Sequence, residues 1–206
     1  MEQEKQNEFD LWSAPTTLEG RQLRLEPLSL VHLDQLAKQL LTKNAWPYKY
    51  WQVRTPKDLE NQIVKLREAT DNKSCNAFAM VVKETGQAVG QSRFMSFNQG
   101  HRYLEIGGTW IGDQWQKTFV NTEAKLLMLT QVFETLKCQR VEFRVDSLNF
   151  NSQRAVLRLG AKFEGELRNS CLLPDGIKRD YRVYSVIESE WPNVKRTLTG
   201  YLNHYV

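Results

Sequence analysis

The segment from Tyr103 to Lys137 holds the residues of this sequence that are best suited to binding a ligand. Two adjacent glycines, Gly107 and Gly108, interrupt a run of aromatic and β-branched residues that predicts a strand over residues 103–111. Because glycine inside a strand has no side chain to pack, such a pair indicates a bulge or a place where another molecule approaches the backbone. The pair therefore predicts a slot in this strand, that is, a place where a ligand can lie against the backbone.

A polar turn after this strand leads to a long helix with a wide apolar face. The helix is predicted from about Asn121, and Thr118, Asn121 and Thr122 are candidate caps for its first turn. Backbone N–H groups of a first turn lack helical partners, and together with the helix dipole they attract anions. We therefore expect a phosphate group to bind here through the backbone. The apolar face consists of Ala124, Leu126, Leu127, Met128, Leu129, Val132, Phe133 and Leu136.

This order of strand, glycine pair, turn sequence WIGDQWQKTFVNTEAK and long helix resembles the acyl-CoA-binding core of the GNAT superfamily of N-acetyltransferases. It is most similar to the branch that contains the bacterial ribosomal-protein α-amino acetyltransferases. In that superfamily the backbone amides of a Gln/Arg-x-x-Gly-x-Gly/Ala turn hold the coenzyme A (CoA) pyrophosphate. Gln116 matches the first position, whereas Phe119 and Asn121 stand at the glycine positions. The run from Val120 to Lys125 again resembles the ribosomal-type branch.

A second part of the resemblance is Asn149-x-x-Ser152 followed by Leu159-Gly160. It implies that Asn149 anchors the pantetheine amide of acetyl-CoA and that Ser152 hydrogen-bonds the leaving sulfur. The alternative is that Asn149 and Ser152 only cap the short helix predicted over residues 152–160. Both parts together extend the resemblance over about residues 16 to 192.

The resemblance also implies where acetyl-CoA binds. A strand, helix and strand of this size form a parallel pair, here around Thr109 and Phe143, and in GNAT folds these two strands part beyond the bulge to admit the pantetheine arm. Lys117 and Arg154 are then placed to meet phosphates, and the alternative for both is a solvated surface charge. The implied cofactor-binding residues are Trp110, Ile111, Gln116, Lys117, Thr118, Phe119, Val120, Asn121, Thr122, Asn149 and Arg154.

Two groups beside the slot are candidates for the chemistry of acetyl transfer. A backbone N–H near Trp110 or Ile111, freed by the bulge, is the expected donor to the thioester oxygen. Glu105 is the candidate base, directly or through water, because a partly buried carboxylate gains basicity. The alternative for Glu105 is an exposed strand carboxylate paired with a cation. Ser152 and Glu105 are thus the predicted catalytic residues.

The loop between the first two predicted helices is unusually rich in aromatic residues. Trp46, Tyr48, Tyr50 and Trp51 lie beside Pro47. They form either a small satellite core or the wall of an acceptor pocket. The resemblance favours the pocket wall, because this segment shapes the acceptor side in GNAT enzymes.

Hydrophobic periodicity outlines the elements that must position these residues. It predicts a strand pair over 16–27, helices over 30–41 and from Pro56, strands over 76–83, 88–97 and 140–146, a hairpin of 163–171 with 177–187, and a helix from Trp191. Within residues 103–111, simple alternation places Leu104, Ile106 and Trp110 on one face.

These elements and the resemblance together predict the fold class. It is α/β of the α+β type: a GNAT fold with a mixed, mostly antiparallel central sheet, flanking helices and splayed parallel central strands. We expect a flexible N-terminal tail over residues 1–15, an acetyltransferase domain over 16–190 and a C-terminal helix of the same domain over 191–206. That helix either packs on the rest of the domain or mediates self-association, so the sequence is compatible with a homodimer.

The composition limits which classes of binding partner and which cellular compartment we expect for this protein. The 206 residues carry a net charge of +4 without any block of Lys and Arg, which argues against nucleic acid. The three cysteines and three histidines lack metal-ligand spacing, so no metal is expected. The polar, acidic start and the lack of a long apolar run predict a cytoplasmic protein that does not enter a membrane.

The leading hypothesis is an acetyl-CoA-dependent N-acetyltransferase that acts on a primary amine by direct attack on the thioester. The amine belongs either to a protein or peptide N-terminus or to a small molecule. A non-catalytic CoA-binding sensor or interaction module is the alternative, and a basic nucleic-acid-binding domain is a weaker third.

Overall fold

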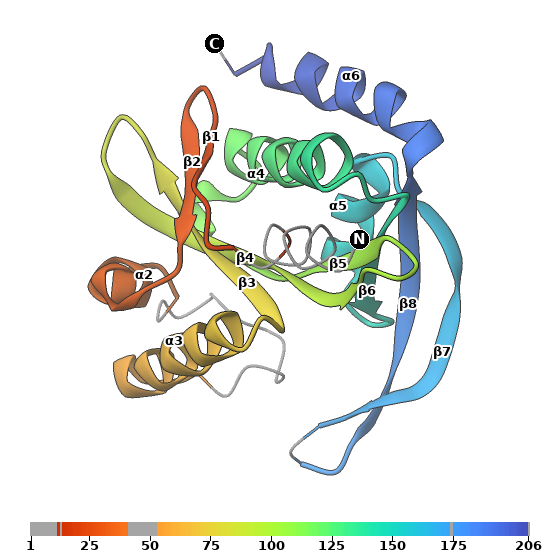
Figure 1. Cartoon of the computed structure of the whole chain (residues 1–206). Helices are drawn as coiled ribbons and strands as arrows, with labels where there is room; N and C mark the ends of the chain where they lie inside the picture. The colour runs from red at the N-terminus through yellow and green to blue at the C-terminus, as the bar shows by residue number, and fades with distance from the viewer. Residues whose placement is uncertain (1–11, 13, 41–52, 174, 206) are drawn as a thin grey trace, which may run out of the picture.

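One eight-stranded sheet organises the protein, in the strand order β1-β2-β3-β4-β5-β6-β8-β7 (Figure 1). The structure is a computed structural model that describes residues 12, 14–40, 53–173 and 175–205. Every neighbouring pair is antiparallel except β5 with β6. The strands are β1 Leu18–Glu19, β2 Leu23–Pro27, β3 Cys75–Val82, β4 Gln87–Asn98, β5 Tyr103–Ile111, β6 Arg140–Asp146, β7 Lys162–Leu172 and β8 Lys178–Ile187. The predicted mixed, mostly antiparallel sheet is confirmed.

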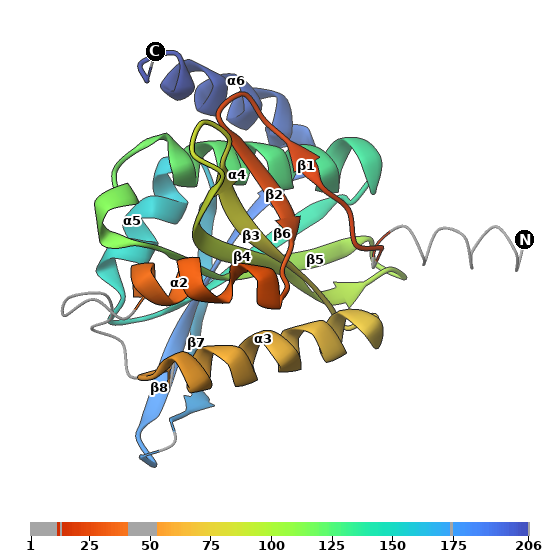
Figure 2. The same ribbon diagram turned by 90° about the vertical axis from the view of Figure 1, so that its left-hand side faces the viewer.

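Helices cover both faces of this sheet. The helices are α2 Leu33–Leu40, α3 Pro56–Asp71, α4 Phe119–Thr130, α5 Phe150–Arg158 and α6 Trp191–Leu202. Helices α2 and α3 lie on one face, and α4, α5 and α6 lie on the other (Figures 1 and 2). Two separate apolar cores result, one beneath α2 and α3 and a larger one beneath α4 and α6. No helix among the described residues combines the length and the apolar character that crossing a membrane requires.

Helix α4 begins two residues before the predicted start. Thr118 is the N-cap, because its side-chain oxygen accepts the backbone N–H of Val120 at 3.4 Å. Of the three candidate caps only this one acts as such, while Asn121 and Thr122 lie within the helix. At its other end, α4 continues as a π-helical turn over Gln131–Thr135. The predicted anion-binding helix start is therefore built around Thr118.

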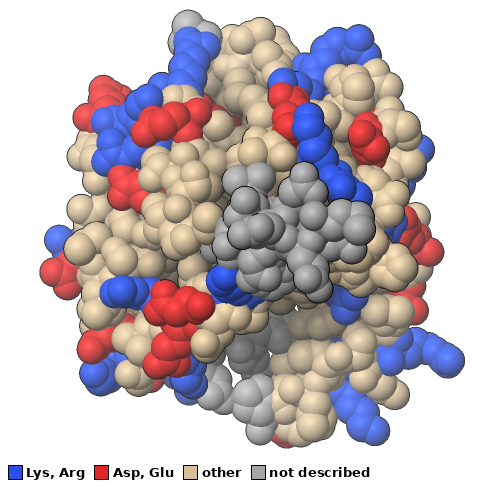
Figure 3. Space-filling view, in the orientation of Figure 1, with Lys and Arg blue, Asp and Glu red and all other residues tan. Residues whose placement is uncertain are grey.

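Both ends of the described chain pack onto the larger core. Trp191 of α6 stacks on Phe133 with 5.4 Å between ring centroids, and Leu198 is fully buried, so α6 serves packing. Trp12 falls within the segment expected to be a tail, yet it is 3% exposed and meets Phe97 edge to face. This part of the predicted tail is therefore packed, and residues 1–11 lie outside the described residues. The described charges on the face in Figure 3 are intermingled, with acidic groups next to basic ones.

Candidate active site

A bulge in β5 shapes the site. Gln91 of β4 pairs with Trp110, but Arg93 pairs with Gly107, so β5 holds one residue more than β4 over this stretch. Gly108 adopts a φ of +57°, and a Cβ atom there would lie 2.8 Å from Arg93 Nε. Glycine is required here for both reasons. The bulge predicted from the glycine pair is confirmed.

The extra residue reverses which face of the sheet each later side chain occupies. Leu104 and Ile106 face the core beneath α4, as simple alternation predicts. Trp110 does not share that face; it is buried in the core beneath α2 and α3 instead. The alternation-based prediction for Trp110 was wrong, because one inserted residue shifts a two-residue period by half a cycle. For the same reason Thr109 points toward α4.

The parallel strands β5 and β6 part immediately beyond their first three residue pairs. Pairing runs from Tyr103 with Arg140 to Glu105 with Glu142, although both strands continue for several residues. A cavity of about 1280 Å³ lies in this gap and reaches both faces of the sheet. The predicted splayed strands are therefore present, and they open a passage through the sheet.

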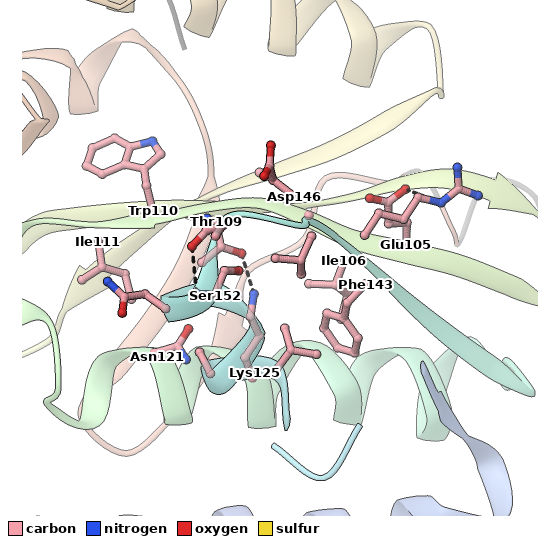
Figure 4. A pocket seen from close by; sticks show the side chains of 18 of the residues that line it. Glu105, Ile106, Thr109, Trp110, Ile111, Asn121, Lys125, Phe143, Asp146 and Ser152 are labelled. Atoms are coloured by element: carbon pink, nitrogen blue, oxygen red, sulfur yellow. Dashed lines mark hydrogen bonds and ion pairs between the residues drawn. The ribbon is translucent and has the colours of Figure 1, made fainter. Parts of the chain in front are cut away.

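The α4 side of the cavity receives side chains from two helices and β5. Thr109, Asn121 and Lys125 converge there with Ser152 (Figure 4). Of the predicted cofactor-binding residues, the following line the cavity: Trp110, Ile111, Gln116, Lys117, Asn121, Asn149 and Arg154. The following do not line it: Thr118, Phe119, Val120 and Thr122. Val120 and Thr122 are buried against other elements, so only their backbone groups could serve a phosphate.

Phe119 fits the turn although it occupies a glycine position of the family pattern. It is the first residue of α4, and helical backbone angles suit any residue type except proline within a helix. Its ring packs edge to face on Trp115, with 6.5 Å between centroids, away from the cavity. The left-handed conformation in this turn falls instead on Lys117, at φ +61°. The departure from the glycine pattern therefore leaves the helix start intact.

Asn149 caps α5, as the structural alternative predicted. Its Oδ1 accepts the backbone N–H of Ser152 at 2.9 Å. The cap uses neither Asn149 Nδ2 nor Ser152 Oγ, and both residues line the cavity. Arg154, one turn further on, donates to Asn151 Oδ1 at 2.7 Å. The cap thus fixes the start of α5 at the edge of the passage.

Glu105 lies on the opposite face of the sheet and is 7% exposed (Figure 4). Ser96 Oγ donates to its carboxylate at 3.2 Å, and Arg144 Nε lies 3.8 Å away. Burial raises the pKa of Glu105, while the charge of Arg144 and the bond from Ser96 act in the lowering direction. The alternative of an exposed carboxylate is therefore wrong, although a cation does stand nearby.

Two further groups on this face were missed by sequence reasoning. Asp146 is 4% exposed; Arg179 Nη2 lies 2.5 Å from its Oδ1, and Oδ2 has no hydrogen-bond partner among the described residues. Tyr181 stands opposite Asp146 in the β6–β8 register, and burial raises the pKa of its hydroxyl. The signal in the sequence was the alternation of polar residues along β6, which puts Glu142, Arg144 and Asp146 on one face.

Lys125 is the other residue that sequence reasoning missed. Its side chain is buried, and Nζ donates to Thr109 Oγ1 at 2.7 Å and to Ser92 Oγ at 3.0 Å. The two hydroxyls are themselves 2.7 Å apart. Burial lowers the pKa of Lys125 to about 7. A lysine within the apolar run of α4 was the available signal, but its partners could not be read from the sequence.

The arrangement is suited to joining two reactants that approach from opposite faces of one sheet. The α4 side offers a helix start and amide side chains for an anionic, amide-containing molecule. The other face offers Glu105 and Asp146, whose carboxylates attract a cation. The aromatic residues predicted to wall an acceptor pocket, Trp46 to Trp51, lie outside the described residues.

Comparison with known proteins identifies one family and relatives that are named N-acetyltransferases. A family model described as an acetyltransferase (GNAT) domain matches residues 22–162. The uncharacterized N-acetyltransferase p20 of Bacillus licheniformis is 31% identical over 94 residues, which are 46% of this chain and 52% of that protein. A Bacillus subtilis protein with the provisional name ribosomal N-acetyltransferase YdaF is 29% identical over 110 residues, 53% of this chain and 59% of that protein. The chain thus spans a little over half the length of these curated relatives.

Solved structures share the fold over most of the chain. A GCN5-related N-acetyltransferase from Brucella melitensis is 30% identical, with a TM-score of 0.83 over 91% of this chain and 86% of that one. RimJ of Mycobacterium smegmatis, solved with CoA-disulfide, is 19% identical, with a TM-score of 0.76 over 91% of this chain and 95% of that one. Because RimJ is only 19% identical, its similarity to this chain concerns the fold alone.

Proposed function

Because this chain belongs to the GNAT family of acetyltransferases, we propose that it transfers an acetyl group from acetyl-CoA to a primary amine. The amine nitrogen attacks the thioester directly. The observation that carries the proposal is the parting of β5 and β6, which opens a cavity through the sheet beside a free helix start. In such a passage the acetyl donor can enter from one face of the sheet and the acceptor amine from the other, so neither blocks the path of the other.

The residues on the α4 side fit the donor. The N–H groups at the start of α4, with Lys117 beside them, would hold the diphosphate. Asn149 Nδ2 and Arg154 on α5 would meet the pantetheine arm and a further phosphate. When bound, acetyl-CoA supplies the acetyl group as a thioester.

The chain's own groups then contribute in three ways. Holding the reactants together in a reactive orientation can supply about 7 to 11 kcal/mol of the barrier reduction. A backbone N–H at the bulge, near Trp110 or Ile111, stabilises the negative charge that develops on the thioester oxygen. Glu105 takes the proton of the amine, and its burial makes it a stronger base than an exposed carboxylate.

The acceptor face favours a positively charged amine. Asp146 Oδ2 is buried in the cavity without a hydrogen-bond partner among the described residues, so it can accept a hydrogen bond from an ammonium group. Among amines we favour a protein or peptide N-terminus, in line with the name of the Bacillus subtilis relative. The non-catalytic sensor loses its main support, because Phe119 at a glycine position does not disturb the start of α4.

Calorimetry with CoA and a thiol-release assay with an amine panel test this proposal together. The panel contains peptides with free N-termini, the same peptides with blocked N-termini, polyamines and aminoglycosides. We expect CoA to bind, and thiol to be released with the free peptides and not with the blocked ones. Binding without thiol release for any amine would establish the sensor instead, and no binding would refute both.

Substitution of Ser152 by alanine tests its role at the sulfur. Loss of one hydrogen bond to a developing thiolate should lower kcat roughly 10- to 100-fold, with little change in KM for acetyl-CoA. The measurement is steady-state thiol release. Ser189→Ala, at an exposed serine remote from the cavity, is the matched control. An unchanged kcat for Ser152→Ala would remove this residue from the mechanism.

Substitution of Asn149 separates binding from capping. Asn149→Asp keeps an oxygen that accepts the N–H of Ser152, but it loses the Nδ2 donor. We expect CoA affinity to fall roughly tenfold while the melting temperature stays near that of the wild type. Asn149→Ala should lower both quantities. If both variants bound CoA as the wild type does, Asn149 would serve only as a cap.

A further inference from the structure

The sheet separates the buried ionisable groups of the cavity into two sets. Glu105, Asp146 and Tyr181 belong to the face beneath α2 and α3, whereas Lys125 lies on the α4 side (Figure 4). We propose that Lys125 is the acid that returns a proton to the coenzyme sulfur when the thioester breaks. This inference rests on the proposed acetyl transfer, and it identifies the group that donates the proton received by the sulfur.

The contacts of Lys125 leave one donor for the passage. A lysine ammonium has three N–H donors, and Nζ uses two of them on Thr109 Oγ1 and Ser92 Oγ. Among the described residues no carboxylate pairs with it. Lys125 lines the cavity, and its partner Thr109 follows the glycine pair, so Nζ lies beside the region where β5 and β6 part.

Burial sets the proton affinity of this amine, and it is the only cause of the shift in its pKa. The charged groups on the elements packed against Lys125 are Arg93 on β4, Glu105 on β5, Arg154 and Arg158 on α5 and Glu123 on α4. Arg154 is exposed and donates to Asn151 Oδ1. Arg93 and Glu105 belong to the opposite face, Arg158 donates to Thr122 Oγ1, and Glu123 accepts backbone N–H groups of the β1–β2 turn. No charged group on these elements therefore offsets the effect of burial on the Lys125 ammonium.

The proton affinity of Lys125 is suited to protonating a thiolate. A lysine with the ordinary pKa of 10.5 holds its proton more tightly than an alkyl thiolate, whose acid has a pKa of about 8.5. Lys125, with its pKa lowered to about 7, gives the proton up to such a thiolate downhill. It is still protonated in about half of the molecules near neutral pH.

Among the described residues that line the cavity on the α4 side, no other ionisable group is buried. Lys117, Asp113 and Arg154 line the cavity but are exposed, so they are not desolvated as Lys125 is. Ser152 can donate a hydrogen bond to sulfur, but a hydroxyl is too weak an acid to protonate it. The two residues therefore act in complementary ways, since Ser152 orients the sulfur and Lys125 protonates it.

The proton balance of one turnover is then complete. The bound ammonium first gives one proton to water, and the neutral acceptor nitrogen then forms a bond to the acetyl carbon and gives one proton to Glu105. The carbon–sulfur bond breaks, its electron pair goes to sulfur, and Lys125 Nζ gives sulfur a proton. Lys125 is left neutral, hydrogen-bonded to Thr109 and Ser92. It regains a proton from water after the products leave, and Glu105 releases its proton to water.

Lys125→Met removes the acid while keeping the length of the side chain. We expect kcat to fall roughly 100-fold and KM for acetyl-CoA to change by less than about threefold. The wild-type kcat should decline as pH rises through about 7, since the acid form is lost, and this decline should be absent in the variant. Lys125→Arg keeps the charge but cannot release a proton at this pH, so it should lose as much activity. Lys65→Met, at an exposed lysine of α3, is the control.

A second readout does not depend on turnover. The folded pKa of Lys125 lies below the unfolded one, so between about pH 7 and 10.5 the unfolded chain binds more protons. The stability of the wild type relative to Lys125→Met should therefore rise with pH, by up to about tenfold in the folding equilibrium constant per pH unit. Urea unfolding at several pH values between about 7 and 9 measures this difference.

The outcomes separate the two proposals. If the wild type releases no thiol with any amine, the acetyl transfer itself is refuted. If the wild type is active and Lys125→Met keeps the decline of kcat near pH 7, only the role of Lys125 is refuted. Should Lys125→Met not fold, Thr109→Val replaces it as the test. Loss of one acceptor for the ammonium should move the decline to lower pH, and an unmoved decline refutes the proposal.

Discussion

Replacement of Glu105 by glutamine is expected to lower kcat by roughly 100- to 10,000-fold while the affinity for CoA stays unchanged. Glutamine has nearly the same shape and can still accept the bond from Ser96, but it cannot take up the proton of the amine. Thiol release under saturating substrates measures kcat, and calorimetry measures CoA binding. A loss of less than about threefold would show that another group is the base.

The pH profile makes this test sharper. Glu105 acts as a base only when it is ionised, and burial raises its pKa above the ordinary 4.5. Activity should therefore fall as pH drops through this raised value, and Glu105→Gln should lack that acidic decline. Glu142, the next carboxylate on the same face, raises the pKa of Glu105 through its charge. Glu142→Gln should accordingly move the acidic decline to lower pH while the maximal kcat is kept.

Replacement of Glu123 by alanine is expected to give the largest loss of stability, about 2 to 4 kcal/mol. Glu123 is 2% exposed, and its Oε1 accepts the backbone N–H groups of Arg21 and Gln22. These bonds tie α4 to the turn between β1 and β2. Without the carboxylate the two N–H groups lose their partner, and the melting temperature should drop by roughly 5 to 15 °C.

Glu123→Gln is the matched control for this prediction. Its amide oxygen can accept the same two N–H groups, so its loss should be less than half that of Glu123→Ala. Neither variant changes a residue that lines the cavity, so the folded fraction of each should bind CoA as the wild type does. Urea and thermal unfolding followed by circular dichroism give the stabilities. An equal loss in both variants would show that charge, and not the accepted hydrogen bonds, holds the turn.

Local patterns were sufficient for most of the fold. The hairpin of β7 with β8, the meander of β3, β4 and β5, and the crossover through α4 all follow from periodicity and turn residues between neighbouring segments. The start of α6 at Trp191 was likewise predicted from Pro192 in its first turn. These features depend on residues close together in the chain, which is why the sequence is informative about them.

The candidate site was only half predictable. Gly107 and Gly108 indicated the bulge because glycine adopts a positive φ, as at Gly108, more readily than other residues, and the order of motifs then indicated an acyl-CoA fold. Alternation failed at Trp110, because the bulge changes the face of every later residue in β5. Glu105 lines the cavity, but the sequence left open whether its carboxylate is buried or exposed, because β5 alone does not show what covers it.

The sequence by itself determined the order of elements, the slot in β5 and the helix start that follows it, since each depends on backbone angles set by nearby residues. Only the tertiary structure decided that Lys125 meets Thr109 and Ser92, and that Asp146 stands beside Tyr181. These contacts join segments from different strands and helices, and they depend on strand register and on a one-residue offset. Burial in that assembly, and not residue type, sets the proton affinities of Lys125 and Glu105.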